Sequence, residues 1–178
     1  CVQLEHISVP HTVTRLLDYV FDKCTALQEV TLPDGVTDIG RHVFESCCCI
    51  TEMIPPKGLR KIGNGAFQGC RMLEKAVLPD GIAEVVDSLF SGCYTLTEIV
   101  IPKSVTAVSR YCFENCQCMK RYYFLPDSPP ELTTTGTFLG LPKDCKFYVP
   151  KGRLDVYQTA ENWSNYASYM VEMEGDVL

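Results

Sequence analysis

The side chains with the greatest chemical potential in this chain of 178 residues are its eleven cysteines. Thiols can form disulfides, bind metal ions or act as nucleophiles. Eleven is an odd number, so the cysteines cannot all pair within one chain. A regular series of them, with a spacing of 23 residues, consists of Cys1, Cys24, Cys47, Cys70, Cys93 and Cys116. A fixed interval indicates a repeat in the chain and not a cluster around one reactive centre.

The spacing favours free thiols over disulfides. If the repeats form stacked coils, neighbouring strands lie about 4.8 Å apart, which is within the Cα separation that a disulfide needs. Equivalent side chains in identical rotamers nevertheless point the same way and not toward each other. We therefore expect reduced, buried thiols that pack as small hydrophobic groups at Cys24, Cys47, Cys70, Cys93 and Cys116. A local disulfide remains an alternative for Cys48, Cys49, Cys112 and Cys118.

Metal binding and catalysis find little support in the sequence. Cys112 and Cys118 flank Cys116, but a structural zinc site needs four converging ligands, commonly from two CxxC-like pairs. No histidine lies near them, and no histidine has an evident Cys or Ser partner; these residues are His6, His11 and His42. We therefore predict no catalytic residue, no metal and no cofactor, and so a protein that is not an enzyme.

The composition of the chain makes some classes of partner unlikely. The formal net charge is −6, the isoelectric point is near 5.1, and Lys and Arg do not cluster. Nucleic acid is therefore an unlikely partner, because phosphate contacts dominate that kind of affinity. No apolar run approaches the roughly 18–20 residues that a membrane span needs. A hydrophobic content of 46% is typical of a folded domain.

The period of 23 residues extends beyond cysteine. Prolines recur at Pro10, Pro33, Pro56, Pro79 and Pro102, and phenylalanines at Phe21, Phe44, Phe67, Phe90 and Phe113. Five full units follow one another, at 4–26, 27–49, 50–72, 73–95 and 96–118. A sixth unit starts at Met119 and departs from the pattern. Cys1 falls inside a unit, so we expect this chain to be part of a longer protein.

Each unit contains the same elements in the same order. Leu27, Val30 and Leu32 carry the apolar pattern of a short strand, which Pro33 ends because proline lacks the N–H of a ladder. A turn and a second extended stretch, 36–39, follow. A short helical turn with Phe and Cys then closes the coil. One unit cannot bury these faces alone, whereas stacked units form a continuous core.

These units resemble the BspA-type leucine-rich repeat. The residues that carry the resemblance are IGNGAFQGC (62–70) and LTEIVIPKSVTAVSRYCFENC (96–116). The resemblance implies an α/β repeat solenoid, right-handed, with a parallel sheet on the concave face and short helical turns on the convex side. It also implies a cell-surface or secreted role in adhesion or ligand binding, without catalysis.

The chain divides into repeats and a cap. Residues 1–125 hold five full repeats and a partial repeat at each end, and residues 126–178 form a capping segment, because a solenoid end must cover its core. Within the cap we predict a loop over 126–144, a strand at 146–149 and a helix from about 153 to 170. Residues 145–167 resemble the segment that commonly follows such arrays. Residues 172–178 are expected to fray.

Outward side chains on the concave sheet are the candidate binding residues. One set, the charge column, reads His6, Glu29, Glu52, Lys75, Glu98 and Arg121. The other set, the apolar stripe, begins with Ser8 and Thr31 and continues with Ile54, Val77, Val100 and Tyr123. An exposed row of β-branched residues that ends in an aromatic is typical of a binding surface. The alternatives are that β-branched residues merely suit strands, or that the cap covers the row.

The functional hypothesis is a binding or adhesion module that recognises an extracellular protein or glycan. The residues proposed to contact it are Glu52, Lys75, Glu98 and Arg121, with the four apolar members of the stripe. The location that the resemblance implies is extracellular or at a bacterial surface. The alternative function is a rigid spacer that presents a binding region located elsewhere in the protein.

Overall fold

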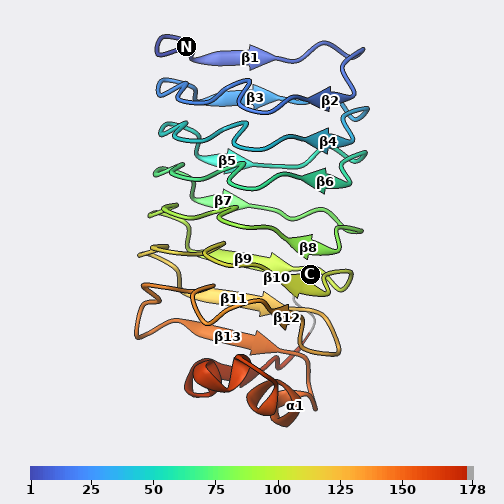
Figure 1. The fold of residues 1–178 in the computed structure, drawn as a ribbon, viewed down its shortest axis with the longest axis vertical. Helices are drawn as coiled ribbons and strands as arrows, with labels where there is room; N and C mark the ends of the chain where they lie inside the picture. The colour runs from blue at the N-terminus through green and yellow to red at the C-terminus, as the bar shows by residue number, and fades with distance from the viewer. Residues whose placement is uncertain (176–178) are drawn as a thin grey trace.

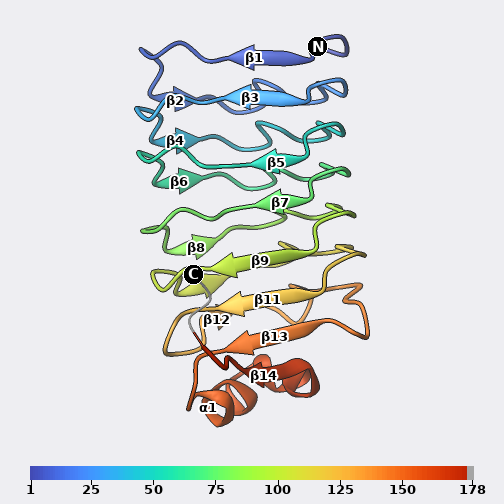
Figure 2. The same cartoon turned by 180° about the vertical axis from the view of Figure 1, so that it is seen from behind.

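The computed structural model describes residues 1–175, which form a solenoid of stacked coils (Figures 1 and 2). Most coils contribute a strand of two to four residues to a first wall and then a two-residue strand to a second wall. The strands of the first wall are β1 (His6–Ser8), β3 (Glu29–Thr31), β5 (Glu52–Met53), β7 (Lys75–Ala76), β9 (Glu98–Ile101), β11 (Arg121–Phe124), β13 (Lys146–Val149) and β14 (Met170–Glu172). Those of the second wall are β2 (Arg15–Leu16), β4 (Asp38–Ile39), β6 (Lys61–Ile62), β8 (Glu84–Val85), β10 (Ala107–Val108) and β12 (Glu131–Leu132).

Strand pairing is parallel throughout both walls, which confirms the predicted parallel solenoid. Residues 23 apart face each other, as His6 faces Glu29 and Glu98 faces Arg121. Pairing is interrupted between β3 and β5, between β7 and β9, and between β6 and β8. The strands are short because a proline follows each first-wall strand of the regular repeats and removes a ladder donor.

The third wall consists of turns, and the short helical turns expected there are not formed in residues 1–175. Backbone N–H groups alternate in direction. Those of Tyr19 and Phe21 donate to the next coil, at 2.9 and 3.0 Å, whereas that of Cys24 donates within its own coil. A helix would direct all of them within the chain. The alternation requires left-handed residues, which recur at Tyr19, His42, Gly65, Ser88 and Tyr111, and at Lys23, Ser46, Gly69, Gly92 and Asn115.

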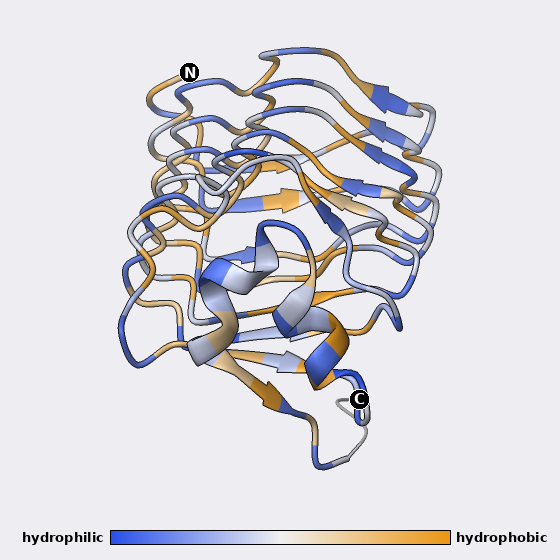
Figure 3. Ribbon diagram, turned by 60° about the horizontal axis from the view of Figure 1, so that its bottom comes forward, coloured by the Kyte–Doolittle hydropathy of each residue, from blue (hydrophilic) through white to orange (hydrophobic). Residues whose placement is uncertain are grey.

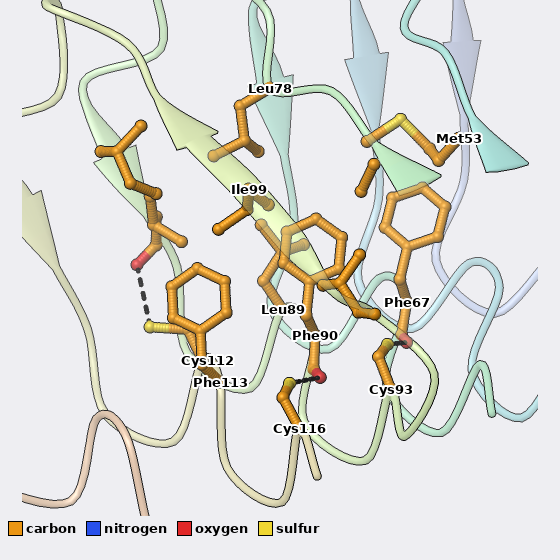
Figure 4. Packing of buried hydrophobic residues seen from close by; sticks show 14 of the residues in the cluster. Met53, Phe67, Leu78, Leu89, Phe90, Cys93, Ile99, Cys112, Phe113 and Cys116 are labelled. Carbon is orange, nitrogen blue, oxygen red and sulfur yellow. Dashed lines mark hydrogen bonds between the residues drawn. The ribbon is translucent and has the colours of Figure 1, made fainter. Parts of the chain in front are cut away.

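The interior is filled by columns of equivalent apolar side chains. Consecutive rings of the phenylalanine column stack with centroids 5.3–5.9 Å apart and planes within 18° of parallel. Figure 4 shows three of these rings, Phe67, Phe90 and Phe113, in successive coils. Phe44 and the three rings of Figure 4 are buried, whereas Phe21 in the first coil is only partly buried. Each ring therefore depends on the coils on both sides.

The cysteine ladder, Cys24, Cys47, Cys70, Cys93 and Cys116, is buried beside these rings. The thiol of Cys93 donates to the carbonyl oxygen of Phe67 in the preceding coil at 3.2 Å, and that of Cys116 to Phe90 at 3.3 Å (Figure 4). Cys47 and Cys70 make the same bond at 3.1 Å. Burial raises the pKa of the Cys47 and Cys116 thiols to about 12. A thiol that stays protonated is what this donor role requires.

Residues 126–144, expected to be a loop, instead complete another coil of the solenoid. β12 pairs with β10, and the ring of Phe138 stacks on that of Phe113 at 5.7 Å. The register between β11 and β13 is 25 residues, as Arg121 faces Lys146. A pattern with a strict period of 23 could not detect this longer coil.

The cap contains the predicted strand 146–149, but the predicted helix from 153 to 170 is broken. It consists of the α-helix α1 (Leu154–Thr159) and the 3₁₀ helix η1 (Trp163–Tyr169), separated at Asn162, whose φ is 63°. The chain then forms β14 beside β13, so the predicted fraying is wrong for residue 172. The part of that prediction on 176–178 lies outside the described residues.

Aromatic packing seals the C-terminal end of the core. Figure 3, with this end brought forward, shows the two helices lying across it. The Trp163 ring meets Phe124 edge-to-face at 4.8 Å, and its indole N–H donates to the carbonyl oxygen of Pro130 at 2.6 Å. The Tyr157 hydroxyl donates to that of Pro126 at 2.8 Å. The buried indole N–H and the buried hydroxyl therefore each have a hydrogen-bond acceptor.

Candidate binding surface

The first wall presents the predicted site residues on its outward side. Side chains alternate along each strand, so that Ile99 and Ile101 of β9 are buried while Glu98 faces solvent and Val100 is half-buried. Register pairs place the charge column and the apolar stripe side by side along the stack, one rung per coil. The structure thus brings the members of each set together.

Members of the charge column bind each other in pairs. The Lys75 ammonium lies 2.7 Å from a Glu52 oxygen. Arg121 donates through Nε and Nη2 to one Glu98 oxygen at 3.0 and 2.7 Å. This bond raises the pKa of the Arg121 guanidinium. His6 lies 3.6 Å from Glu29. The column is therefore largely self-neutralised.

The apolar stripe is exposed at its start and partly buried further on. The side chains of Ile54 and Val77 are 63% and 41% exposed, and Val100 and Tyr123 are half-buried. The cap lies across the end of the solenoid (Figure 3) and leaves Ile54 and Val77 exposed. The row is accessible to a macromolecule from this side.

Sequence reasoning missed three residues that extend these sets. Tyr148 stacks on Tyr123 with centroids 4.9 Å apart, and Val171 of β14 faces Tyr148 in register. Lys146 continues the charge column and makes no ion pair within residues 1–175. The alternation of 146–149 repeats that of 121–124 and could have revealed two of them. Its spacing of 25 residues concealed the match.

All eleven cysteines are free thiols. Cys112 is buried and its thiol donates to the carbonyl oxygen of Ser109 at 2.7 Å, while Cys48 is half-buried and donates to that of Ser46 at 3.3 Å. Cys1 and Cys118 are exposed. The alternative of a local disulfide thus receives no support.

Two of the three histidines, His6 and His42, lie beside carboxylate side chains. His42 on the third wall lies 2.9 Å from a Glu45 oxygen and stacks on Tyr19 at 5.1 Å. Within residues 1–175, His, Cys, Asp and Glu do not assemble in groups of three or more that could hold a metal ion. Over the same range, no helix combines the length and apolar character that crossing a membrane requires.

Comparison with known proteins gives a family match. The family model of the BspA type leucine-rich repeat region matches residues 1–120, in six copies. Comparison with curated proteins finds no match.

Several solved structures share the fold. A leucine-rich repeat protein from Bacteroides ovatus is 26% identical over 85% of this chain and 47% of its own, with a TM-score of 0.62. A leucine-rich repeat protein from T. pallidum is 25% identical over 94% of this chain and 71% of its own, with a TM-score of 0.64. The pneumococcal vaccine antigen PcpA is 21% identical over 97% of this chain and 42% of its own, with a TM-score of 0.74. The chain thus spans about half the length of the first of these relatives.

Proposed function

Because this chain belongs to the BspA-type leucine-rich repeat family, we propose that it is a non-catalytic module that binds another macromolecule through the apolar stripe. The family consists of repeat proteins that typically mediate interactions and lack catalysis. The stripe on the first wall supplies the surface, and the proposal concerns this segment of the protein.

The observation that carries the proposal is a row of outward apolar side chains, exposed at Ile54 and Val77 and half-buried at Val100 and Tyr123. Its members Ile54, Val77, Val100, Tyr123 and Tyr148 come from five successive coils, and the rings of Tyr123 and Tyr148 stack on each other. Soluble domains rarely expose contiguous apolar surface without a partner for it. Tyrosine is enriched where proteins bind each other, because it buries a large area at a small entropy cost. A rigid row of this kind is suited to an extended partner.

The partner that fits the stripe best is a protein. Glycans present many hydroxyl groups, which must find donors and acceptors once water is displaced. Beside the stripe, Glu52 and Lys75 already satisfy each other, as do Glu98 and Arg121. Ile54, Val77 and Val100 offer only apolar contact. A protein segment with apolar side chains matches this chemistry.

The location and the finer geometry belong to the same proposal. Members of this family occur widely in bacterial surface proteins, so we infer that the module is displayed at a cell surface or secreted. From family membership we further infer a right-handed superhelix whose first wall is its concave face. The rival function, a rigid spacer, makes no use of the stripe.

The test is binding to a panel of extracellular-matrix proteins and glycans. The wild type is compared with Val77→Arg/Val100→Arg, which places two charges on the stripe. Leu139→Arg/Val156→Arg is the matched control, because these residues are also exposed, at 53% and 44%, and lie outside the first wall. Circular dichroism verifies that each variant folds.

Saturable binding of a protein that is lost in the stripe variant and kept in the control supports the proposal. Equal loss in both variants contradicts the location of the site. Binding of glycans alone contradicts the choice of a protein partner. No binding by the wild type favours the spacer.

A further inference from the structure

A groove crosses the second wall of the N-terminal coils, on a face separate from the apolar stripe. Its volume is about 670 Å³, and it passes over β2, β4, β6 and β8. The backbone at Gly40 and Gly63 forms part of its lining. A Cβ atom added to Gly63 would lie 2.5 Å from the Gly40 carbonyl carbon. This position thus stays free of side chains because the coils approach each other too closely.

The groove coincides with the interruption of the second wall between β6 and β8. In the preceding coils, the N–H groups of Gly40 and Gly63 donate to the coil before them at 2.9 and 2.8 Å. The equivalent N–H of Val86, and that of Ala83, make no hydrogen bond within residues 1–175. Backbone donors left free beside a groove are available to a ligand with acceptor oxygens.

Three of the four cationic side chains that line the groove make no ion pair within the described residues, whereas its carboxylates already have protein partners. Arg41 and Lys61 make no ion pair within the described chain, and neither does Arg60, whose guanidinium donates to backbone carbonyls. These three side chains are exposed.

The acidic side chains of the groove have protein partners. Asp18 accepts the N–H of Arg41 at 2.8 Å. Asp38 accepts the Thr37 hydroxyl at 2.6 Å and lies 3.9 Å from Arg15. Glu84 accepts the hydroxyl of Ser109. The groups that remain unsatisfied are therefore mainly donors.

From this arrangement we propose that the groove binds an acidic polysaccharide, with its carboxylate or sulfate groups on Arg41, Arg60 and Lys61. The ring hydroxyls contact Asp18, Asp38 and the free N–H groups of Ala83 and Val86. Leu17, which is 72% exposed at one end of the groove, covers an apolar ring face. The groove spans three strand intervals, about 14 Å, and so takes several sugar units.

The chemistry of the groove favours a polysaccharide over other polyanions. Nucleic acid is disfavoured by the three carboxylates and by the lack of an aromatic side chain among the groove residues. An acidic peptide would use the cations but leave Asp18 and Asp38 facing like charges. A sugar provides hydroxyl groups for these carboxylates and acidic groups for the cations. With a net charge of −6, the protein as a whole repels polyanions, so binding requires the local cations.

The experiment is calorimetric titration at several salt concentrations with heparin, which is sulfated, and polygalacturonate, which is carboxylated. Dextran is the neutral control and polyglutamate the acidic polypeptide. The test variant is Arg41→Gln/Lys61→Gln. Lys103→Gln/Lys120→Gln removes the same charge from exposed residues outside the groove. If the double variant does not fold, Lys61→Gln alone carries the test.

We expect binding of heparin or polygalacturonate that weakens with salt, and the stronger of the two identifies the acidic group. Each groove substitution should weaken it about tenfold, while the control pair changes it about twofold or less. The proposal is overturned if neither polysaccharide binds, if both variant pairs lose affinity equally, or if polyglutamate binds as tightly. Val77→Arg/Val100→Arg should leave this binding intact, so the groove and the stripe are tested separately.

Discussion

At the C-terminal end of the solenoid Trp163, the first residue of η1, is 1% exposed against the core, whereas at the N-terminal end Leu17 is 72% exposed and Phe21 only half-buried. The two ends carry the same kind of coil. They differ in what covers the last layer of the core. At the C-terminal end the cap adds aromatic rings and hydrogen-bonds them to the backbone of the last complete coil.

A coil gains its stability from its neighbours. The stacked rings from Phe44 to Phe113 each have a ring on both sides, while Phe21 has one on one side only. In a repeat protein, stability is close to a sum of repeat and interface terms. Substitutions in the core at the capped end should therefore lower the free energy of unfolding more than substitutions at the N-terminal end.

The largest effect is expected at the cap. Trp163→Ala should lower the free energy of unfolding by about 3–5 kcal/mol, because it leaves a cavity in the aromatic cluster and the Pro130 carbonyl without its donor. Leu17→Ala should stay within about 0.5 kcal/mol. Urea unfolding followed by circular dichroism measures both. Equal losses of unfolding free energy in the two variants would contradict a difference in stability between the two ends.

The phenylalanine column offers a second test of how stability depends on neighbouring coils. Phe90→Ala, in the middle, should cost about 3–4 kcal/mol, and Phe21→Ala, in the first coil of this segment, about half of that, since its ring is partly buried and stacks on one neighbouring ring. The same unfolding experiment reports both values. If Phe21→Ala proves as costly as Phe90→Ala, stacking on both sides is not the source of stability.

Alkaline pH tests the interior of the solenoid. The Cys116 thiol has its pKa raised from 9.0 to about 12 by burial, so the folded state holds its proton more tightly than the unfolded state. The stabilisation is complete below pH 9 and is lost as pH rises from 9 to 12. At pH 10 this thiol should contribute about 1 kcal/mol less than at pH 7.

The check is the unfolding free energy of wild type and Cys116→Ala at both pH values. The variant should lose less stability over that range. An equal loss would show that this buried thiol does not titrate with folding.

The smallest effect concerns two tyrosines near the capped end. The Tyr122 hydroxyl is buried and has no hydrogen-bond partner within the described residues, so Tyr122→Phe should raise the free energy of unfolding by about 1 kcal/mol. Tyr157→Phe should lower it by a similar amount, because it removes the bond to Pro126. Thermal unfolding distinguishes the signs. A loss in Tyr122→Phe would reveal a partner for that hydroxyl.

Much of the fold was predictable because it depends on local pattern. The alternation in 98–101 assigned buried and outward residues correctly, and the strand at 146–149 follows from apolar alternation before Pro150. The third wall was not predictable in this way. Tyr19 and His42 adopt left-handed φ values of 61° and 51°, which propensity disfavours and bonds to the next coil stabilise.

The helical part of the cap was also only partly predictable from local pattern. Apolar spacing predicted one helix over 153–170, because Tyr157, Trp163 and Tyr166 lie on a helical stripe. All three are buried as expected of a stripe, but the chain breaks at Asn162, whose side-chain amide donates to the carbonyl oxygen of Leu132 at 2.8 Å. That bond joins residues 30 apart, so no local pattern contained it.

Local residue pattern sets the period and the inward and outward side of each strand, and hence which residues form the core. These follow from the residue types at fixed positions of each unit. Tertiary structure alone decided the register of 25 residues, the pairing of β14 with β13, the thiol-to-carbonyl bonds and the groove at the interrupted ladder. Each of these depends on how closely two coils approach, which is set by packing between segments and not by the residues of either one.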